Sequence, residues 1–98
     1  MTIKATLKVI EEERSGISNV SGNAWKMRSV VLEWTEQAAP DARRTQRVRA
    51  TMFGPVCEEF NRSGVQIGSA VSVDLDFTTS SARNGYVYNE VRVAAIQL

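Results

Sequence analysis

Residues 45–60, TQRVRATMFGPVCEEF, contain the clearest strand and helix signals of the sequence. Its first half alternates between two sets of side chains, which is the period of a strand with one buried face. One set is Val48, Ala50 and Met52, and the other is Arg47, Arg49, Thr51 and Phe53. Gly54-Pro55 then ends the strand, because Pro is favoured in the first turn of a helix. We therefore predict a strand over residues 45–53 and a short helix after it, with Val56, Cys57 and Phe60 on its apolar face.

The segments before this stretch also alternate with a period of two. Residues 3–9 and 24–35 predict two strands, and residues 11–23 between them are rich in charged and turn-forming side chains. Residues 36–44 contain Pro40 and Asp41 and predict a loop. Trp25 and Trp34 differ in parity, so without a β-bulge they cannot both face the core, and we expect Trp25 to be the exposed one.

The segments after it predict a hairpin. Residues 71–77 and 86–93 alternate in the same way, and Asn84-Gly85 between them is a strong signal for a type I′ turn. The expected fold is thus all-β, a single domain over residues 1–98, with five strands and one short helix between strands three and four. This is the order of a five-stranded OB-fold barrel. An open α+β sandwich and other small β-barrels are the alternatives.

Composition excludes several classes of function. The chain has no His and a single Cys, Cys57, so the sequence offers neither a zinc site nor an ordinary acid–base centre, and we expect no enzyme, metal or cofactor. Asp74 and Asp76 share a strand face and are read as a solvated pair rather than a cation site. No apolar run is long enough for a membrane span or a leader, and with one Cys we expect a cytoplasmic protein.

Charge is unevenly distributed along the chain. The net charge is only +1, but residues 24–53 carry six basic and three acidic side chains, a net of +3. A local excess of this kind can steer an anionic partner to one face. Scattered solvated charges are the alternative explanation.

Short motifs resemble those of bacterial single-stranded DNA-binding proteins. Met52-Phe53-Gly54 before the helix and Gly68-Ser69-Ala70-Val71-Ser72-Val73 after it are similar to the same stretch of that family. The hairpin Asn84 to Val91 is similar to its last hairpin. The chain looks still closer to a short, uncharacterised bacterial OB-fold family with a Gly-Asn-x-Trp-Lys strand, here Gly22 to Lys26, and an Asn-Gly-x-x-Tyr hairpin.

The resemblance implies a surface for single-stranded nucleic acid, DNA rather than RNA. It would place Phe53 on the DNA-facing surface, and Tyr86 and Tyr88 at the base of the last hairpin. Arg47 stands where the family carries a base-stacking Trp, and the long linker and acidic tail that recruit its partners are missing. Together with the charge pattern, the predicted site is Trp25, Lys26, Arg28, Arg47, Arg49, Phe53, Tyr86 and Tyr88.

Three other interpretations of these residues stay open. Phe53 and Trp25 could pack in the core, since large aromatic side chains usually help to fill small cores. The module could instead bind an acidic protein or itself, and we expect a homo-oligomer in either case because an exposed Trp favours burial in an interface. Oligosaccharide binding would use the same OB face but has no need of the arginines.

Overall fold

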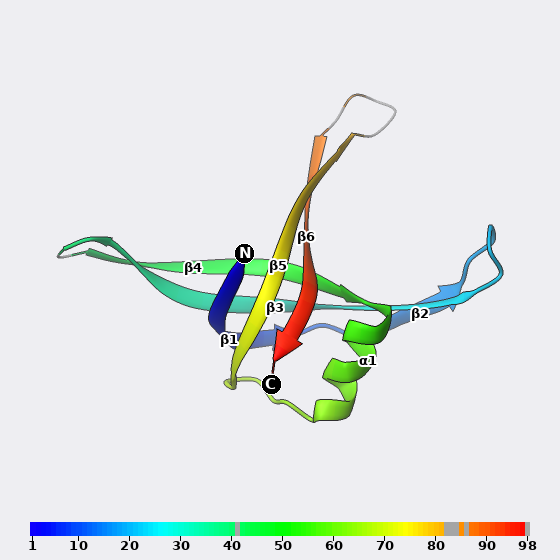
Figure 1. The fold of residues 1–98 in the computed structure, drawn as a ribbon, viewed down its shortest axis with the longest axis horizontal. Helices are drawn as coiled ribbons and strands as arrows, with labels where there is room; N and C mark the ends of the chain where they lie inside the picture. Colours follow the sequence, from blue (N-terminus) through cyan, green and yellow to red (C-terminus); the bar gives the residue numbers. More distant parts are fainter. Residues whose placement is uncertain (41, 82–84, 86, 98) are drawn as a thin grey trace.

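Strands make up most of the computed structural model, which describes residues 1–40, 42–81, 85 and 87–97. Along the chain the elements are β1 (Thr2–Ile10), β2 (Arg14–Ile17), β3 (Ala24–Ala39), β4 (Ala42–Phe53), α1 (Gly54–Ser63), β5 (Ala70–Ser81) and β6 (Val87–Gln97). Along the chain the helix follows the hairpin β3–β4 and precedes the hairpin β5–β6, as the sequence predicts (Figure 1). Pro55 stands in its first turn, and Gly64 ends it in the left-handed conformation, with φ of 69°.

Five of the strands pair in a closed ring. β3 pairs antiparallel with β4 over nearly its whole length, and β4 meets β6 in parallel at Thr51 and Arg92. β6 pairs antiparallel with β5, β5 with β1, and β1 returns to β3 between Thr6 opposite Glu33 and Ile10 opposite Val30. The predicted all-β architecture is therefore confirmed as a closed sheet of five strands, with β2 added at the edge of β3.

The core fills the inside of this ring. Its members are the inward side chains of the five ring strands together with two side chains of α1. They are Ala5, Leu7, Val30, Leu32, Ala50, Met52, Cys57, Phe60, Val71, Val73, Leu75, Val93 and Ile96. Cys57 is fully buried, which confirms its prediction as a small core side chain. Because α1 supplies Cys57 and Phe60, the helix closes one end of the core.

Two segments differ from the sequence prediction. The predicted loop 36–44 is wrong, because β3 continues to Ala39 and β4 begins at Ala42. The cross-strand pair Glu36–Arg44 joins opposite charges in this extension, and Pro40 lies at the turn, where its missing N–H interrupts no ladder. Residues 14–17, predicted as part of a loop, form β2 because they pair with residues 24–27 of β3. The long hairpins give the chain extents of 53 × 39 × 19 Å (Figure 1).

One polar pair is buried on the outer side of the β3–β4 hairpin. The hydroxyls of Ser29 and Thr51 lie 3.0 Å apart, and the two residues are only 3% and 8% exposed. The register places them directly opposite each other on neighbouring strands. Each hydroxyl therefore provides the hydrogen-bond partner that the other needs once water is excluded.

This pair predicts a non-additive effect on stability. Either Ser29→Ala or Thr51→Val alone should lower the free energy of unfolding by roughly 1–3 kcal/mol, because the remaining hydroxyl is buried without its partner. The double variant should lose clearly less than the sum of the two single losses. Urea unfolding of the wild type and the three variants measures this coupling. Strictly additive losses would mean that the two hydroxyls do not depend on each other.

Candidate functional site

The outward face of β3 and β4 carries basic and aromatic side chains on both sides of the buried Ser29–Thr51 pair. On β4 these are Arg47, Arg49 and Phe53, which alternate with the inward Val48, Ala50 and Met52. On β3, Trp25 and Met27 lie on the same side, because Met27 is opposite Phe53 and side chains two residues apart share a face. We call Trp25, Arg47, Arg49 and Phe53 the outer row; the structure brings these four predicted residues to one face.

Lys26 and Arg28 belong to the other face of β3. They alternate with Trp25 and Met27, so their side chains point to the opposite side of the strand. Arg28 donates to the backbone oxygen of Glu11 at 2.9 Å and to Oδ1 of Asn61 at 2.7 Å, and its guanidinium lies 5.9 Å from the Phe60 ring centre. Arg28 therefore ties α1 to the sheet from the other face of β3, although it and Arg49 both contact Glu11.

Both arginines of the outer row have acidic partners. Arg47 donates to Glu33 on β3 at 2.6 Å, and Arg49 makes a two-pronged contact with Glu11 at 2.5 and 2.9 Å. The hydrogen bond from Arg49 holds the pKa of the Glu11 carboxyl below its ordinary value, and the same bond raises the pKa of Arg49. The arginine side chains remain 68% and 61% exposed, so both are open to solvent despite these contacts.

Trp25 and Phe53 border a groove at one end of the outer row. The groove has a volume of about 580 Å³, and Gly16, Lys26 and Glu58 also line it. Trp25 is 43% and Phe53 37% exposed, so neither aromatic side chain is a core residue. Trp34, by contrast, is half-buried against the core, which confirms the prediction that Trp25 is the exposed tryptophan.

Each ring at the groove is held by a contact from a neighbouring strand. A Cβ built on Gly16 of β2 would lie 2.7 Å from Cζ2 of Trp25, so the indole lies directly against the Gly16 backbone. The Arg92 guanidinium of β6 lies 4.7 Å from the centre of the Phe53 ring and also donates to Glu90 at 3.2 Å. Cation–π contact of this kind fixes a ring without burying it.

The side chains of the two predicted tyrosines, Tyr86 and Tyr88, lie outside the described part of the structure. Tyr86 and the turn residue Asn84 lie outside the described residues. The backbone of Tyr88 lies in β6 opposite Ser80, while its side chain is also outside the described part. Its place in β6 puts it on the hairpin that extends beyond the ring (Figure 1).

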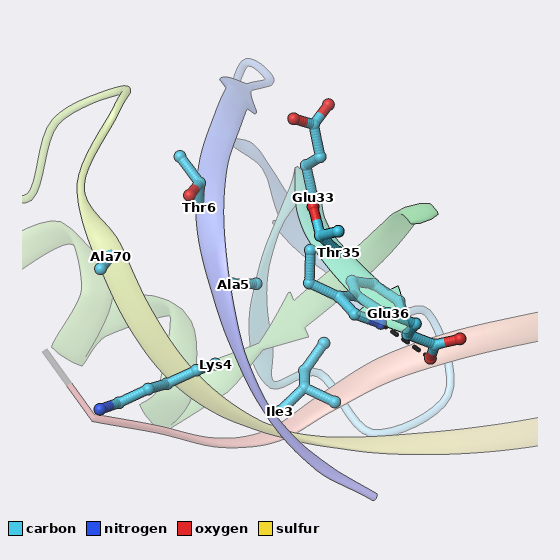
Figure 2. A pocket seen from close by; sticks show the side chains of 9 residues that line it. Ile3, Lys4, Ala5, Thr6, Glu33, Thr35, Glu36 and Ala70 are labelled. Atoms are coloured by element: carbon cyan, nitrogen blue, oxygen red, sulfur yellow. Dashed lines mark hydrogen bonds between the residues drawn. The ribbon is translucent and has the colours of Figure 1, made fainter. Parts of the chain in front are cut away.

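A second hollow lies where β1 and β3 separate. Pairing between them stops at Thr6 and Glu33, although β3 continues to Ala39. The resulting wedge has a volume of about 490 Å³, with Ile3 and Ala5 of β1 on one side and Glu33, Thr35 and Glu36 of β3 on the other (Figure 2). Trp34, which also lines it, donates to Glu36 at 3.0 Å. Strand edges of both β1 and β3 thus border an open space.

Sequence reasoning missed four residues that shape the site. They are Glu11 and Glu33, which pair with the arginines, and Gly16 and Arg92, which hold the two rings. Alternation in the last strand predicts that Arg92 shares an outward face with Tyr88, but it gave no sign of the contact between Arg92 and Phe53. The other three depend on the register between strands, for which the sequence contained no signal.

The remaining ionisable and metal-ligating side chains of the described residues lie outside the outer row and the groove. They contain no group of three or more His, Cys, Asp or Glu side chains that could hold a metal ion. Asp74 binds the N-terminal ammonium at 3.3 Å, and burial raises the pKa of the Cys57 thiol. No helix in the described ranges is long and apolar enough to cross a membrane.

Comparison with known proteins does not assign the chain to a family. No family model matches the sequence, and no curated protein matches it. The site must therefore be interpreted from its own geometry.

The contact between Gly16 and Trp25 predicts a local effect. Gly16→Ala should displace the indole, because real Cβ atoms essentially never approach another atom as closely as 2.7 Å. In a Trp34→Phe background, where Trp25 is the only tryptophan, acrylamide should quench the Trp25 emission of Gly16→Ala more strongly. The neighbouring exposed substitution Ser15→Ala is the control and should leave quenching unchanged. Equal quenching in all three proteins would show that Gly16 does not position the ring.

The Arg49–Glu11 pair predicts a pH-dependent contribution to stability. Because the folded-state pKa of Glu11 lies below its ordinary value of 4.5, the pair stabilises the fold above that value, and the contribution is lost as the pH falls through the folded pKa. Glu11→Gln should therefore be less stable than wild type at pH 7, and the difference should disappear in acid. Urea unfolding at several pH values measures it, with Glu12→Gln, an adjacent exposed side chain, as the control. A difference independent of pH would contradict the assignment.

Proposed function

We propose that the chain is an OB-fold module that binds single-stranded DNA along the outer row. The observation that carries the proposal is the placement of two exposed arginines and two exposed aromatic rings on one face of neighbouring strands. Proteins that hold single strands without sequence preference combine cations along the backbone path with aromatic rings on which bases stack. The outer row supplies both kinds of group within the single hairpin β3–β4.

The ring of strands supports the OB-fold part of the proposal. Taken without β2, the strands pair in the order β1-β3-β4-β6-β5 and back to β1, with the helix between the third and fourth of them in the chain. OB-folds are five-stranded, partly open barrels that bind oligonucleotides on the face of their second and third strands. Here those two strands are β3 and β4, which carry the outer row. The resemblance to bacterial single-stranded DNA-binding proteins belongs to the same proposal.

The ion pairs of Arg47 and Arg49 affect how strongly these arginines can bind phosphate. Exposed ion pairs contribute little to stability, so a phosphate can replace a carboxylate partner at small cost. Glu33 and Glu11 hold the two guanidiniums in defined positions before the ligand arrives. The same carboxylates compete with phosphate, so their removal should strengthen binding rather than weaken it. Stronger DNA binding after removal of a carboxylate would therefore show that the arginine binds phosphate, whereas an arginine with only a structural role would show no such change.

Oligo-dT binding tests the proposal. Replacing Arg47 and Arg49 by Ala should weaken binding and flatten the dependence of affinity on salt, because fewer counterions are released. Phe53→Ala should weaken binding by roughly 1–3 kcal/mol with little change in that slope, since stacking neutralises no phosphate. Glu11→Gln should strengthen binding, because it leaves Arg49 without its competitor. Fluorescence titration at two salt concentrations measures all three effects.

Thermal unfolding of each variant is the control. Loss of binding counts only where the variant unfolds near the wild-type temperature; Phe53 is 37% exposed, so its truncation should leave the fold intact. If the wild type binds no oligo-dT even at about 50 mM salt, where electrostatic attraction is strong, the nucleic-acid proposal fails.

A protein-interaction module that self-associates, in the cytoplasm, is the second candidate. The wedge between β1 and β3 favours it, because in the described part of the chain β1 does not pair with β3 beyond Glu33, although Thr35 and Glu36 border the same hollow (Figure 2). Open strand edges can pair with another chain. On this interpretation the ion pairs of the outer row have only a structural role, and Glu11→Gln does not strengthen the binding of oligo-dT.

A further inference from the structure

The groove beside the outer row differs from the rest of that face in its chemistry. Aromatic rings border it, and two charged residues, Glu58 of α1 and Lys26 of β3, also line it. The Lys26 side chain lies on the face of β3 opposite Trp25, and both residues border the groove because β3 has no β4 partner beyond Met27, which is opposite Phe53. Neither charged group makes a hydrogen bond or ion pair with another residue in the described part of the chain, whereas both arginines of the outer row are paired. The groove therefore offers polar groups that are free to recognise a ligand.

We propose that the groove between Trp25 and Phe53 is a pocket for one guanine base of the bound strand. The inference rests on the proposed function and adds to it a preference for a particular base. Its volume of about 580 Å³ lies inside the range of about 300–1,000 Å³ typical of small-ligand sites. Single-stranded nucleic acids are recognised by stacking unpaired bases on aromatic rings and by hydrogen bonds to their Watson–Crick edges.

The Trp25 and Phe53 rings are already held in position and partly exposed, as stacking on a base requires. Trp25 lies against the Gly16 backbone and Phe53 against the Arg92 guanidinium, so each ring is held from one side and stays partly exposed. A planar base that enters the groove gains contact with rings whose positions are already restricted. The ordering cost of binding is lower for such rings than for mobile side chains.

Glu58 and Lys26 together select guanine among the four bases. Guanine presents two adjacent donors, N1–H and the 2-amino group, beside the O6 acceptor. The two carboxylate oxygens of Glu58 can accept from both donors, and the Lys26 ammonium can donate to O6. Adenine and cytosine each place a single amino donor beside an acceptor, and thymine places its one donor between two acceptors. Only guanine therefore uses both oxygens of the carboxylate.

The test compares oligo-dT with the same oligomer carrying dG, dA or dC at its central position. Wild type should bind the dG oligomer about 5- to 100-fold more tightly than the others, the range that one bidentate base contact supplies. Glu58→Gln should lose this preference and keep its affinity for oligo-dT. Glu59→Gln, the adjacent exposed side chain of α1 that does not line the groove, is the matched control and should keep the preference.

A second readout follows the base itself. In the Trp34→Phe background, a base stacked in the groove should quench the Trp25 emission, more strongly for the dG oligomer than for oligo-dT. Lys26→Gln should reduce the dG preference without removing the quenching, because it changes an edge contact and leaves both rings in place.

The outcomes separate this inference from the proposed function. Tight oligo-dT binding without a base preference, or with one that Glu58→Gln leaves intact, overturns the guanine pocket alone. A Glu58-dependent preference for dC overturns the assignment to guanine. Failure to bind any of the oligomers overturns both the pocket and the proposed function.

Discussion

Strands β4 and β6 meet in parallel at Thr51 and Arg92, and this contact joins the hairpin β3–β4 to the hairpin β5–β6. With β1 bridging β3 and β5 on the other side, it converts a row of strands into a closed sheet. Closure gives every ring strand an inside and an outside. The inside becomes the apolar core, and the outer face of β3 and β4 is left to carry charge and exposed rings.

The same contact shapes the candidate site. It brings Arg92 of β6 beside Phe53 at the end of β4, so one strand pairing both closes the core and orients an exposed ring. The added strand β2 does the same for Trp25 through Gly16. The two rings at the groove are therefore positioned by residues from opposite ends of the chain. Only a completed fold places them together.

Electrostatics across the molecule is more balanced than the charge of residues 24–53 suggests. Glu33 lies inside that segment and Glu11 outside it, and each neutralises an arginine of the outer row. A surface of this kind attracts phosphate less strongly than unpaired arginines would, but it holds their guanidiniums in place. Lys26 and Glu58, which make no ion pair among the described residues, differ from these arginines because they lie at the groove rather than in the outer row.

Local sequence patterns were enough to locate the five ring strands in outline, the helix, and the inward and outward faces. Alternation in residues 45–53 correctly separated Val48, Ala50 and Met52 from the outer row, and Gly54-Pro55 marked the helix start, because both signals act between near neighbours in the chain. Strand parity likewise separated Trp25 from Trp34. It also implied that Lys26 and Arg28 lie opposite Trp25, yet residue type and proximity in sequence placed them in the predicted site.

The partners of these residues follow from the complete fold. Alternation assigns a residue to a face but does not encode the register between two strands, so it gave no sign of the pairing of Arg49 with Glu11, of Trp25 with Gly16 or of Phe53 with Arg92. The extension of β3 and β4 through residues 36–44 and the formation of β2 were missed because these segments lack apolar alternation. A strand is stabilised by the hydrogen bonds and side chains of its neighbour, so a polar segment becomes a strand once the fold supplies one.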